Sequence, residues 1–171
     1  MNILGITGSI GWDGNIEQWL CDWSDFRVHD SGATLIMNGE LKTAIQEERF
    51  SRNKHEGNYP IRSIQTILDH NKLTKNDIDL VVYVFGANTI GWHLKRVGYI
   101  ENKLQGEFPN CKVEFLSHHV AHSAATFYTS GFEEANILSF DGAGDAELQP
   151  NGQWLVPHMK FSQGKDLTLT E

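Results

Sequence analysis

Cysteine is nearly absent from this chain of 171 residues, which carries only Cys21 and Cys111. Two cysteines are too few for a disulfide framework, so a disulfide-stapled secreted fold is excluded and a reducing cytoplasm is the expected location. The first ten residues, MNILGITGSI, lack the charged segment and the length of a signal peptide. No apolar run approaches the roughly 20 residues that span a bilayer, so no membrane role is expected.

Basic residues are also scarce. Lys and Arg number 14 against 22 for Asp and Glu, which gives a formal net charge of −8. This balance argues against nucleic acid or an anionic membrane as the bulk partner, although a local cationic patch can still bind a small anion. Hydrophobic residues make up 40% of the chain, which is enough for a core, and the length suits one domain or part of a larger one.

The order of apolar segments predicts an α/β fold. We expect strands at residues 2–7, 79–86, 112–116 and 135–140, a hairpin at 33–46, and helices at 60–73, 90–105 and 118–128. Asn38-Gly39 supplies the hairpin turn, and Ile61, Ile64, Ile67 and Leu68 form one apolar stripe on the first helix. The run at 79–86 is typical of a strand in a sheet covered on both faces.

Residues 9–28 show no sustained period and are predicted to form an insertion loop. They carry Trp12, Trp19 and Trp23, three of the five tryptophans. Exposed aromatic side chains of this kind can line an acceptor pocket. A loop packed by its own side chains explains the same composition equally well.

A weak internal repeat relates the two ends of the chain. NILGITG at residues 2–8 and NILSFDG at 136–142 are alike, and turn-rich sequence follows each. The repeat predicts a duplicated α/β unit whose second copy begins near residue 135. A sheet that stops after one or two strands leaves apolar edges unpaired, so residues 135–171 are expected to need further sequence or a partner.

Three histidines cluster in the segment SHHVAH at residues 117–122. On the predicted helix His118 and His122 lie one turn apart on one face, which is the spacing of helical two-histidine metal sites. His119 stands where zinc proteases have a Glu, so that reaction class is not expected. Asp141, at the end of the next predicted strand, is the candidate third ligand. Two imidazoles and one carboxylate leave metal positions open for substrate oxygens; alternatively, these histidines cap and pack a surface helix.

The segment His29-Asp30-Ser31-Gly32 precedes the predicted hairpin. Small polar residues at such a bend can present N–H and hydroxyl donors to an anion, and His29 can act as an acid or a base near neutral pH. A turn with an Asx-type hydrogen bond explains the same residues without a ligand.

Two further segments can bind anions. Arg49, Arg52 and Lys54 make residues 46–55 the most cationic stretch, suited to phosphate or carboxylate, although a solvated charge run has the same composition. Gly142 and Gly144 follow a predicted strand and let backbone N–H groups approach a phosphate. Their spacing matches neither the P-loop nor the dinucleotide-binding fingerprint.

Together these segments resemble a known family. NILGI, HDSGATLIMNGEL, QEERFSRNKH followed by YPIRSI, SHHVAH and LSFDGAG, in this order, resemble the N-terminal part of the O-carbamoyltransferases that modify nodulation factors and antibiotics. The resemblance spans most of residues 1–145. It implies an ASKHA-type domain, with the mixed sheet flanked by helices of actin and sugar kinases, similar to the tRNA threonylcarbamoyl transferase. The first RNase H-like subdomain would occupy residues 1–134, and residues 135–171 would begin a truncated second one.

The resemblance also implies an activity and a site. The family transfers a carbamoyl group from carbamoyl-adenylate, made from carbamoyl phosphate and ATP, to a hydroxyl of a small molecule or natural product. His29 and Lys54 match catalytic positions, and His118, His122 and Asp141 match ligands of a divalent metal, with Fe(II) the expected ion. The expected substrate- or nucleotide-binding residues are Asp30, Ser31, Arg49, Arg52, Gly142 and Gly144.

The implied partners are a small-molecule hydroxyl acceptor, the second ASKHA half and an adenylate-forming domain, on the same polypeptide or a separate subunit. Sugar, polyketide and nucleoside acceptors all stay open. One alternative is a metal- and nucleotide-binding subunit of a split enzyme. The other is an ASKHA-type protein that binds a nucleotide without chemistry.

Overall fold

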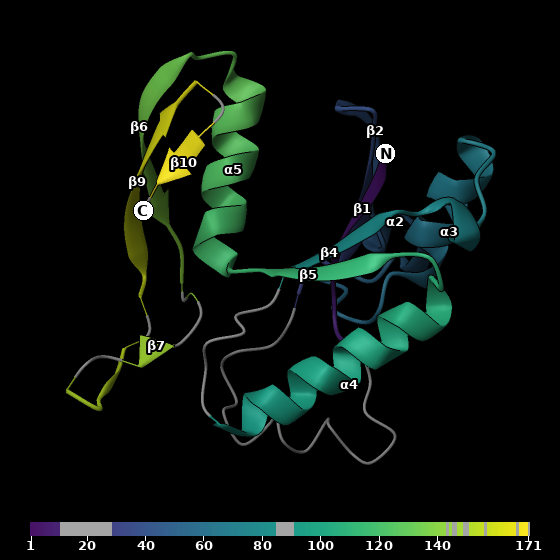
Figure 1. Ribbon diagram of the computed structural model, residues 1–171, viewed down its shortest axis with the longest axis horizontal. Coiled ribbons are helices and arrows are strands. Elements are labelled where there is room, and N and C mark those ends of the chain that lie inside the picture. The colour runs from purple at the N-terminus through teal and green to yellow at the C-terminus, as the bar shows by residue number, and fades with distance from the viewer. Residues whose placement is uncertain are drawn as a thin grey trace. The chain divides into compact units, whose positions relative to one another are not determined.

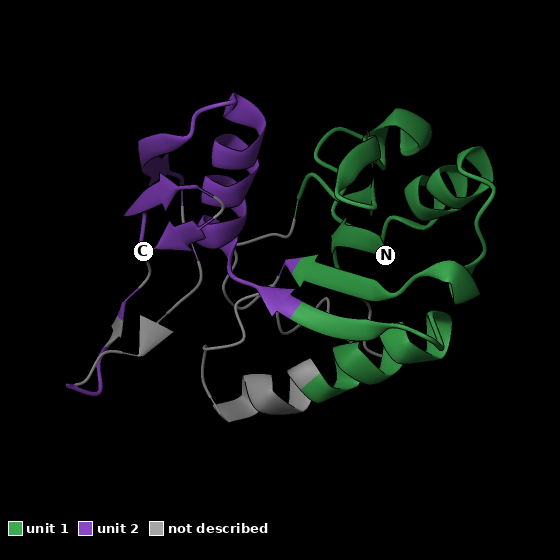
Figure 2. Cartoon of the chain, turned by 45° about the horizontal axis from the view of Figure 1, so that its top comes forward, with its two compact units in different colours: residues 1–83, 98–114 green, residues 84–97, 115–171 purple. Residues whose placement is uncertain are grey.

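A computed structural model describes residues 1–10, 29–84, 91–142, 144, 147–148, 151–155, 157–166 and 168–170 (Figure 1). Of residues 91–97, 147, 148 and 154 only the backbone is described. The predicted insertion loop lies outside the described residues from position 11 onward, and its three tryptophans with it. The chain divides into two compact units (Figure 2): unit 1 comprises residues 1–83 and 98–114, and unit 2 residues 84–97 and 115–171. The predicted subdomain boundary near residue 135 stays a prediction.

Unit 1 is built on a five-stranded mixed sheet in the order β3-β2-β1-β4-β5. Its strands are β1 (Asn2–Thr7), β2 (Gly32–Met37), β3 (Glu40–Gln46), β4 (Leu80–Val84) and β5 (Lys112–Leu116). The last residues of β4 and β5 are assigned to unit 2. β1 pairs antiparallel with β2 and parallel with β4, and β2 pairs antiparallel with β3. The sheet and its helices confirm the predicted α/β fold class with a mixed sheet.

The hairpin turn between β2 and β3 follows from its sequence. Asn38 and Gly39 have φ angles of 53° and 84°, and a two-residue turn of this type needs positive φ at both positions. Asn and Gly are the residues that adopt such angles most readily. The predicted hairpin is therefore confirmed.

Helices accompany this sheet. They are α2 (Glu48–Ser51), α3 (Ile61–His70), the 3₁₀ turn η1 (Lys75–Asp77) and α4 (Gly91–Glu107). α3 packs on β2 and β3 and buries Ile64, Ile67 and Leu68, as its stripe predicts. Ile61, the fourth member of that predicted stripe, is instead 66% exposed, because it begins the helix at the edge of the apolar face.

The carboxylate of Glu47 connects β3, α2 and α3. It is 7% exposed and accepts hydrogen bonds from the backbone N–H groups of Arg62 (3.2 Å) and Ser63 (2.8 Å) and from the Ser63 hydroxyl (2.7 Å). These N–H groups belong to the first turn of α3, which has no intrahelical partners for them. Glu47 therefore caps α3 from a distant position in the sequence.

The part of unit 2 after β5 is described as a helix packed on a small sheet. Helix α5 (His118–Ser130) packs on an antiparallel sheet of order β10-β9-β6, formed by β6 (Glu134–Phe140), β9 (Met159–Lys165) and β10 (Thr168–Thr170). β7 (Glu147–Leu148) and β8 (Trp154–Leu155) form a separate pair. The predicted helix and strand in this part of the chain are confirmed.

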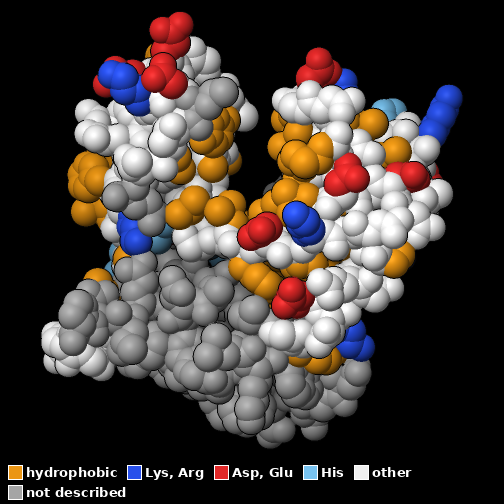
Figure 3. Space-filling model, in the orientation of Figure 1, with side chains coloured by type: hydrophobic (Ala, Val, Ile, Leu, Met, Phe, Trp, Pro, Cys, Tyr) orange, Lys and Arg blue, Asp and Glu red, His pale blue; other side chains and the backbone are white. Residues whose placement is uncertain are grey.

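Helix α5 meets this sheet through residues spaced four apart. His119, Ser123 and Phe127 are buried, and the Phe127 ring lies so close to Gly164 that a Cβ there would overlap it. The opposite face of the sheet leaves Leu138, Phe140 and Phe161 exposed, and Figure 3 shows hydrophobic side chains on this part of the surface. None of the helices in the described part of the chain combines the length and apolar character that crossing a bilayer requires.

Replacing Glu47 by Ala is expected to lower the free energy of unfolding by about 1–3 kcal/mol, because it leaves buried donors of α3 without acceptors. Urea unfolding followed by circular dichroism measures the change. Glu40→Ala, which removes an exposed carboxylate paired with Lys42, is the control and should leave the midpoint unchanged. Equal midpoints for the two variants would contradict the capping role.

Candidate functional site

The Asp141 cluster, formed by His118, His122 and Asp141, lies where α5 begins and β6 ends. The Nε2 atoms of His118 and His122 lie 2.5 Å and 3.0 Å from the same carboxylate oxygen, Oδ2 of Asp141, and 3.1 Å from each other. Metal bonds of about 2.0–2.2 Å bring ligand atoms to roughly 3 Å from one another. The three atoms thus have the spacing that one cation requires, and the predicted grouping of these residues is what the structure shows.

The environment of Asp141 keeps its carboxylate ionised. The hydrogen bond from His118 is the largest influence and, with one from the Gly142 backbone N–H (2.6 Å), it lowers the Asp141 pKa from 3.8 to about 2 despite partial burial. Since the folded pKa is below the ordinary value, these contacts stabilise the fold above about pH 4 and are lost as the pH falls toward 2. Near neutral pH Asp141 is therefore a charged carboxylate, which is the form that can bind a cation.

His119 has a different role from its two neighbours. It is 2% exposed, and its Nε2 lies 3.0 Å from the carbonyl oxygen of Pro157, which can only accept, so Nε2 carries the proton. Its Nδ1 lies 2.6 Å from the Ser139 hydroxyl. His119 is thus a buried imidazole that joins α5 to β6, and it is not a member of the Asp141 cluster.

Gly144 lies against this buried imidazole. A Cβ added there would overlap the His119 ring and lie 3.0 Å from the Pro157 carbonyl oxygen. The Gly144 N–H donates to the same oxygen at 2.8 Å. Close packing therefore gives a reason for glycine at this position beside the predicted phosphate contact, whereas a Cβ on Gly142 would meet nothing within 4 Å.

The Asp30 cluster, formed by His29, Asp30 and His55, lies in unit 1 at the segment before β2. The Nδ1 atom of His29 lies 2.6 Å from Oδ2 of Asp30, and Nδ1 of His55 lies 3.1 Å from Oδ1. These contacts, chiefly the one with His29, lower the pKa of Asp30. Backbone bonds hold the segment: the Ser31 N–H donates to Glu56 O (2.7 Å), and the Glu47 N–H donates to Ser31 O (2.9 Å).

The predicted cationic residues lie beside this cluster in the sequence. Lys54 is largely exposed, and its ammonium donates to Oε1 of Glu48 at 2.9 Å. The other oxygen of Glu48 accepts the backbone N–H of His55 at 3.3 Å. Arg49 donates to Gln46 at 3.3 Å. Glu48 thus fixes both the Lys54 side chain and the backbone of the next residue.

Two predicted binding residues of this region differ in exposure. Ser31 is fully buried, and its hydroxyl has no hydrogen-bond partner among the residues that the structure describes. Arg52 is exposed and ends α2 in the left-handed conformation with φ 61°. Arg52 is therefore available to an anion, whereas Ser31 lies below the surface.

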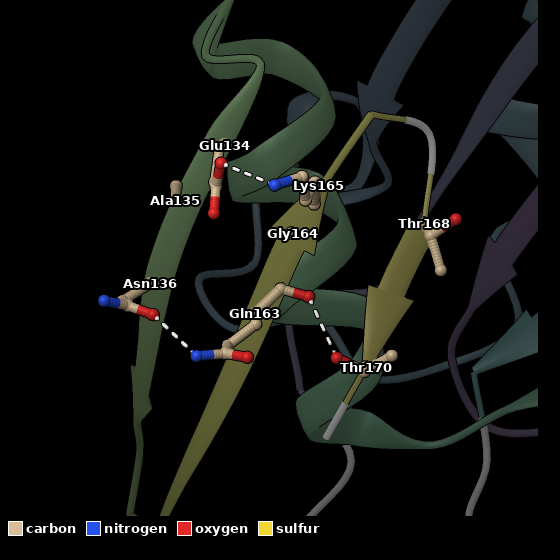
Figure 4. A pocket seen from close by; sticks show the side chains of 8 residues that line it. All are labelled: Glu134, Ala135, Asn136, Gln163, Gly164, Lys165, Thr168 and Thr170. Atoms are coloured by element: carbon tan, nitrogen blue, oxygen red, sulfur yellow. Dashed lines mark hydrogen bonds and ion pairs between the residues drawn. The ribbon is translucent and has the colours of Figure 1, made fainter.

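A surface pocket of unit 2 lies elsewhere (Figure 4). Glu134 pairs with Lys165 at 3.1 Å, and Gln163 donates to Asn136 at 3.2 Å. The remaining lining residues are Ala135, Gly164, Thr168 and Thr170. Of the lining residues that the structure describes, none is a predicted site residue, so this pocket is not the candidate site.

Sequence reasoning named all members of the Asp141 cluster but missed His55 and Glu48. His55 directly follows Lys54, and both His55 and Glu48 lie in the QEERFSRNKH segment that carries the family resemblance, but no role was predicted for either. Its contact with Asp30 joins positions 25 residues apart. The Asp30 cluster belongs to unit 1 and the Asp141 cluster to unit 2.

Comparison of the sequence with known protein families finds a match. Residues 21–110, just over half of the chain, match the family described as carbamoyltransferase N-terminus. The nodulation protein NolNO of Sinorhizobium fredii is 29% identical over 163 residues, covering 85% of this chain and 24% of that protein. The uncharacterized protein MJ1051 of Methanocaldococcus jannaschii is 34% identical over 117 residues, covering 68% and 21%. The chain thus spans about a quarter of the length of these curated relatives.

Solved structures resemble the chain more distantly. YeaZ from Pseudomonas aeruginosa aligns with a TM-score of 0.47 and 11% identity, covering 96% of this chain and 69% of that one. HypF from T. kodakarensis aligns with a TM-score of 0.48 and 13% identity, covering 96% and 17%.

Replacing Gly144 by Ala is expected to lower the free energy of unfolding by about 1–3 kcal/mol, because the added methyl group must displace the buried His119 ring. Thermal or urea unfolding measures the effect. Gly142→Ala, two positions away and with open space around its Cβ, is the matched control. If both variants unfold at the wild-type midpoint, the inference that His119 leaves no room for a Cβ at position 144 is wrong.

Proposed function

The chain belongs to the carbamoyltransferase N-terminus family, and from this membership we propose that it takes part in transferring a carbamoyl group to a hydroxyl of a small-molecule or natural-product acceptor. The proposed donor is carbamoyl-adenylate, formed from carbamoyl phosphate and ATP by an adenylate-forming domain on the same polypeptide or a partner subunit. The observation that best supports a catalytic site is the convergence of two imidazoles on one oxygen of Asp141.

His118, His122 and Asp141 would hold a divalent cation, with Fe(II) the proposed ion. Two imidazoles and one carboxylate suit iron or zinc and leave coordination positions open. The low pKa of Asp141 supports this role, because the carboxylate needs no deprotonation to become a ligand. When bound, such a cation would supply positive charge to the phosphate oxygens of the donor. Gly142 holds the other carboxylate oxygen in place.

His29 is the proposed proton acceptor of the transfer. The acceptor oxygen bonds to the carbamoyl carbon, the bond from that carbon to the adenylate phosphate oxygen breaks, and AMP leaves. The proton of the attacking hydroxyl passes to the His29 imidazole. The His29 side chain is 62% exposed, so a substrate can reach it.

Lys54 would bind the carbamoyl oxygen or a phosphate as negative charge develops. Its ammonium is paired with Glu48 in this structure, and the Lys54 side chain itself is 78% exposed, so an anionic substrate can reach it. Arg49 and Arg52, exposed on the same segment, add positive charge for nucleotide phosphates.

Replacing His118 by Ala in the purified chain is expected to weaken Fe(II) or Co(II) binding by more than about 100-fold, since loss of an outer-shell partner alone costs roughly 10–100-fold. Asp141→Asn should act similarly. Isothermal titration and the Co(II) absorption spectrum measure binding. His70→Ala, an exposed histidine at the end of α3, is the control. Wild-type affinity in His118→Ala would exclude the Asp141 cluster as the metal site.

Replacing His29 by Ala is expected to lower kcat of carbamoyl transfer by about 10²- to 10⁴-fold, the usual contribution of a general base. The assay supplies carbamoyl-adenylate and a hydroxyl acceptor to an enzyme reconstituted with the regions that the longer relatives carry. His70→Ala again serves as control.

Unchanged turnover in His29→Ala would refute the base assignment. A wild-type protein that binds carbamoyl-adenylate without transferring its carbamoyl group would instead favour a nucleotide-binding role.

A further inference from the structure

The Asp30 and Asp141 clusters share the same residue types but use the carboxylate differently. At Asp141 both imidazoles approach one oxygen, and their donor nitrogens lie 3.1 Å apart. At Asp30 each imidazole has an oxygen of its own, and the two rings lie edge to face with centroids 6.3 Å apart. Asp30 is therefore a bridge between two rings, whereas the Asp141 donors gather around one point.

This bridging contact determines where each ring carries its proton. The pKa of Asp30 is lowered, so the carboxylate is ionised near neutral pH and can only accept hydrogen bonds. The Nδ1 atoms of His29 and His55 must therefore both donate to it. A neutral imidazole has a single N–H, so the Nε2 atom of each ring is left unprotonated and able to accept a proton.

The backbone holds this arrangement at some conformational cost. Asp30 and His55 have φ angles of 55° and 57°, in the left-handed region that few non-glycine residues adopt. The bond from Ser31 N–H to Glu56 O joins the segments that carry Asp30 and His55, and the bond from His55 N–H to Glu48 holds the backbone of His55. Strained conformations of this kind are concentrated at functional sites.

We propose that Asp30 is a positioning residue that holds His29 and His55 as Nδ1–H tautomers, so that both rings present Nε2 as a proton acceptor. The proposal rests on the transfer function, which uses His29, and adds His55 as a second acceptor beside it. Both side chains are exposed, so a substrate can reach either ring.

Long-range ¹H–¹⁵N NMR spectra of the ¹⁵N-labelled chain show directly which nitrogen of each ring is protonated. They are recorded at about pH 8.5, which is well above the ordinary imidazole pKa. Signals of the two rings are assigned from the His29→Gln and His55→Gln variants. We expect both rings to show a protonated Nδ1 and a bare Nε2. A predominant Nε2–H form of either ring in the wild-type chain would overturn the proposal.

Two substitutions of Asp30 give distinct outcomes. Asp30→Gly tolerates the positive φ but removes the acceptor, so the Nδ1–H form should fall from the predominant species to a minority in both rings. Asp30→Asn keeps one acceptor oxygen and offers an amide donor in place of the other. It should therefore keep one ring as Nδ1–H and switch the other to Nε2–H, a split that a purely structural role would not produce.

Asp69→Asn is the control, because Asp69 accepts only the Gln65 side chain among the hydrogen bonds described for its carboxylate. It should leave both tautomers unchanged. Wild-type tautomers in both Asp30→Gly and Asp30→Asn would overturn the positioning role, and if the glycine variant fails to fold, the asparagine variant decides alone.

Zinc titration separates this proposal from a second metal site, since the Asp30 cluster also brings its donor atoms within 4.8 Å of one another. We expect one tight equivalent per chain, lost in His118→Ala and retained in His55→Gln. A second equivalent that disappears in His55→Gln would overturn the bridging assignment. If both rings are Nδ1–H tautomers but His29→Ala transfers the carbamoyl group normally, the positioning role of Asp30 stands and only the proposed function is refuted.

Discussion

The buried carboxylate of Glu47 is the interaction on which the arrangement of unit 1 depends. The carboxylate oxygens of Glu47 accept hydrogen bonds from the first backbone N–H groups of α3. The backbone carbonyl of Glu47 accepts the first N–H groups of α2, and its backbone N–H donates to the carbonyl of Ser31, just before β2. An uncompensated carboxylate would not be stable at this degree of burial, so these donors are required. Because Glu47 ties these elements together, the segments that carry Asp30 and His55 are held at one place on the sheet.

Unit 2 uses a buried imidazole for the same purpose. His119 donates to the Pro157 carbonyl and forms a second hydrogen bond with the Ser139 hydroxyl, and these two bonds fix the orientation of α5 on β6. Once His119 faces the sheet, helical geometry carries His118 and His122 to a neighbouring face, beside the end of β6 where Asp141 lies. The residue whose presence rules out a zinc-protease motif in the sequence is thus the one that orients the Asp141 cluster.

Local rules predicted the parts of the structure that depend on local geometry. The Asn-Gly hairpin, the span of β1 and the pairing of His118 with His122 follow from turn chemistry, apolar runs and the four-residue helical spacing. The contact between His55 and Asp30 could not be predicted in this way, because it depends on left-handed backbone at both positions and joins segments 25 residues apart. Neither composition nor periodicity reports such a contact.

The two carboxylates show why residue types alone do not define a site. Two histidines and one aspartate meet in each unit, and the hydrogen bonds of each cluster lower the pKa of its aspartate. What differs is the sharing of oxygens. Two imidazole nitrogens that lie 3.1 Å apart beside one oxygen have the spacing of ligands around a single cation, as proposed for the Asp141 cluster. Two nitrogens with separate oxygens are each satisfied by a hydrogen bond, which suits the paired proton acceptors proposed for the Asp30 cluster. The number of carboxylate oxygens engaged is therefore what distinguishes the two proposals.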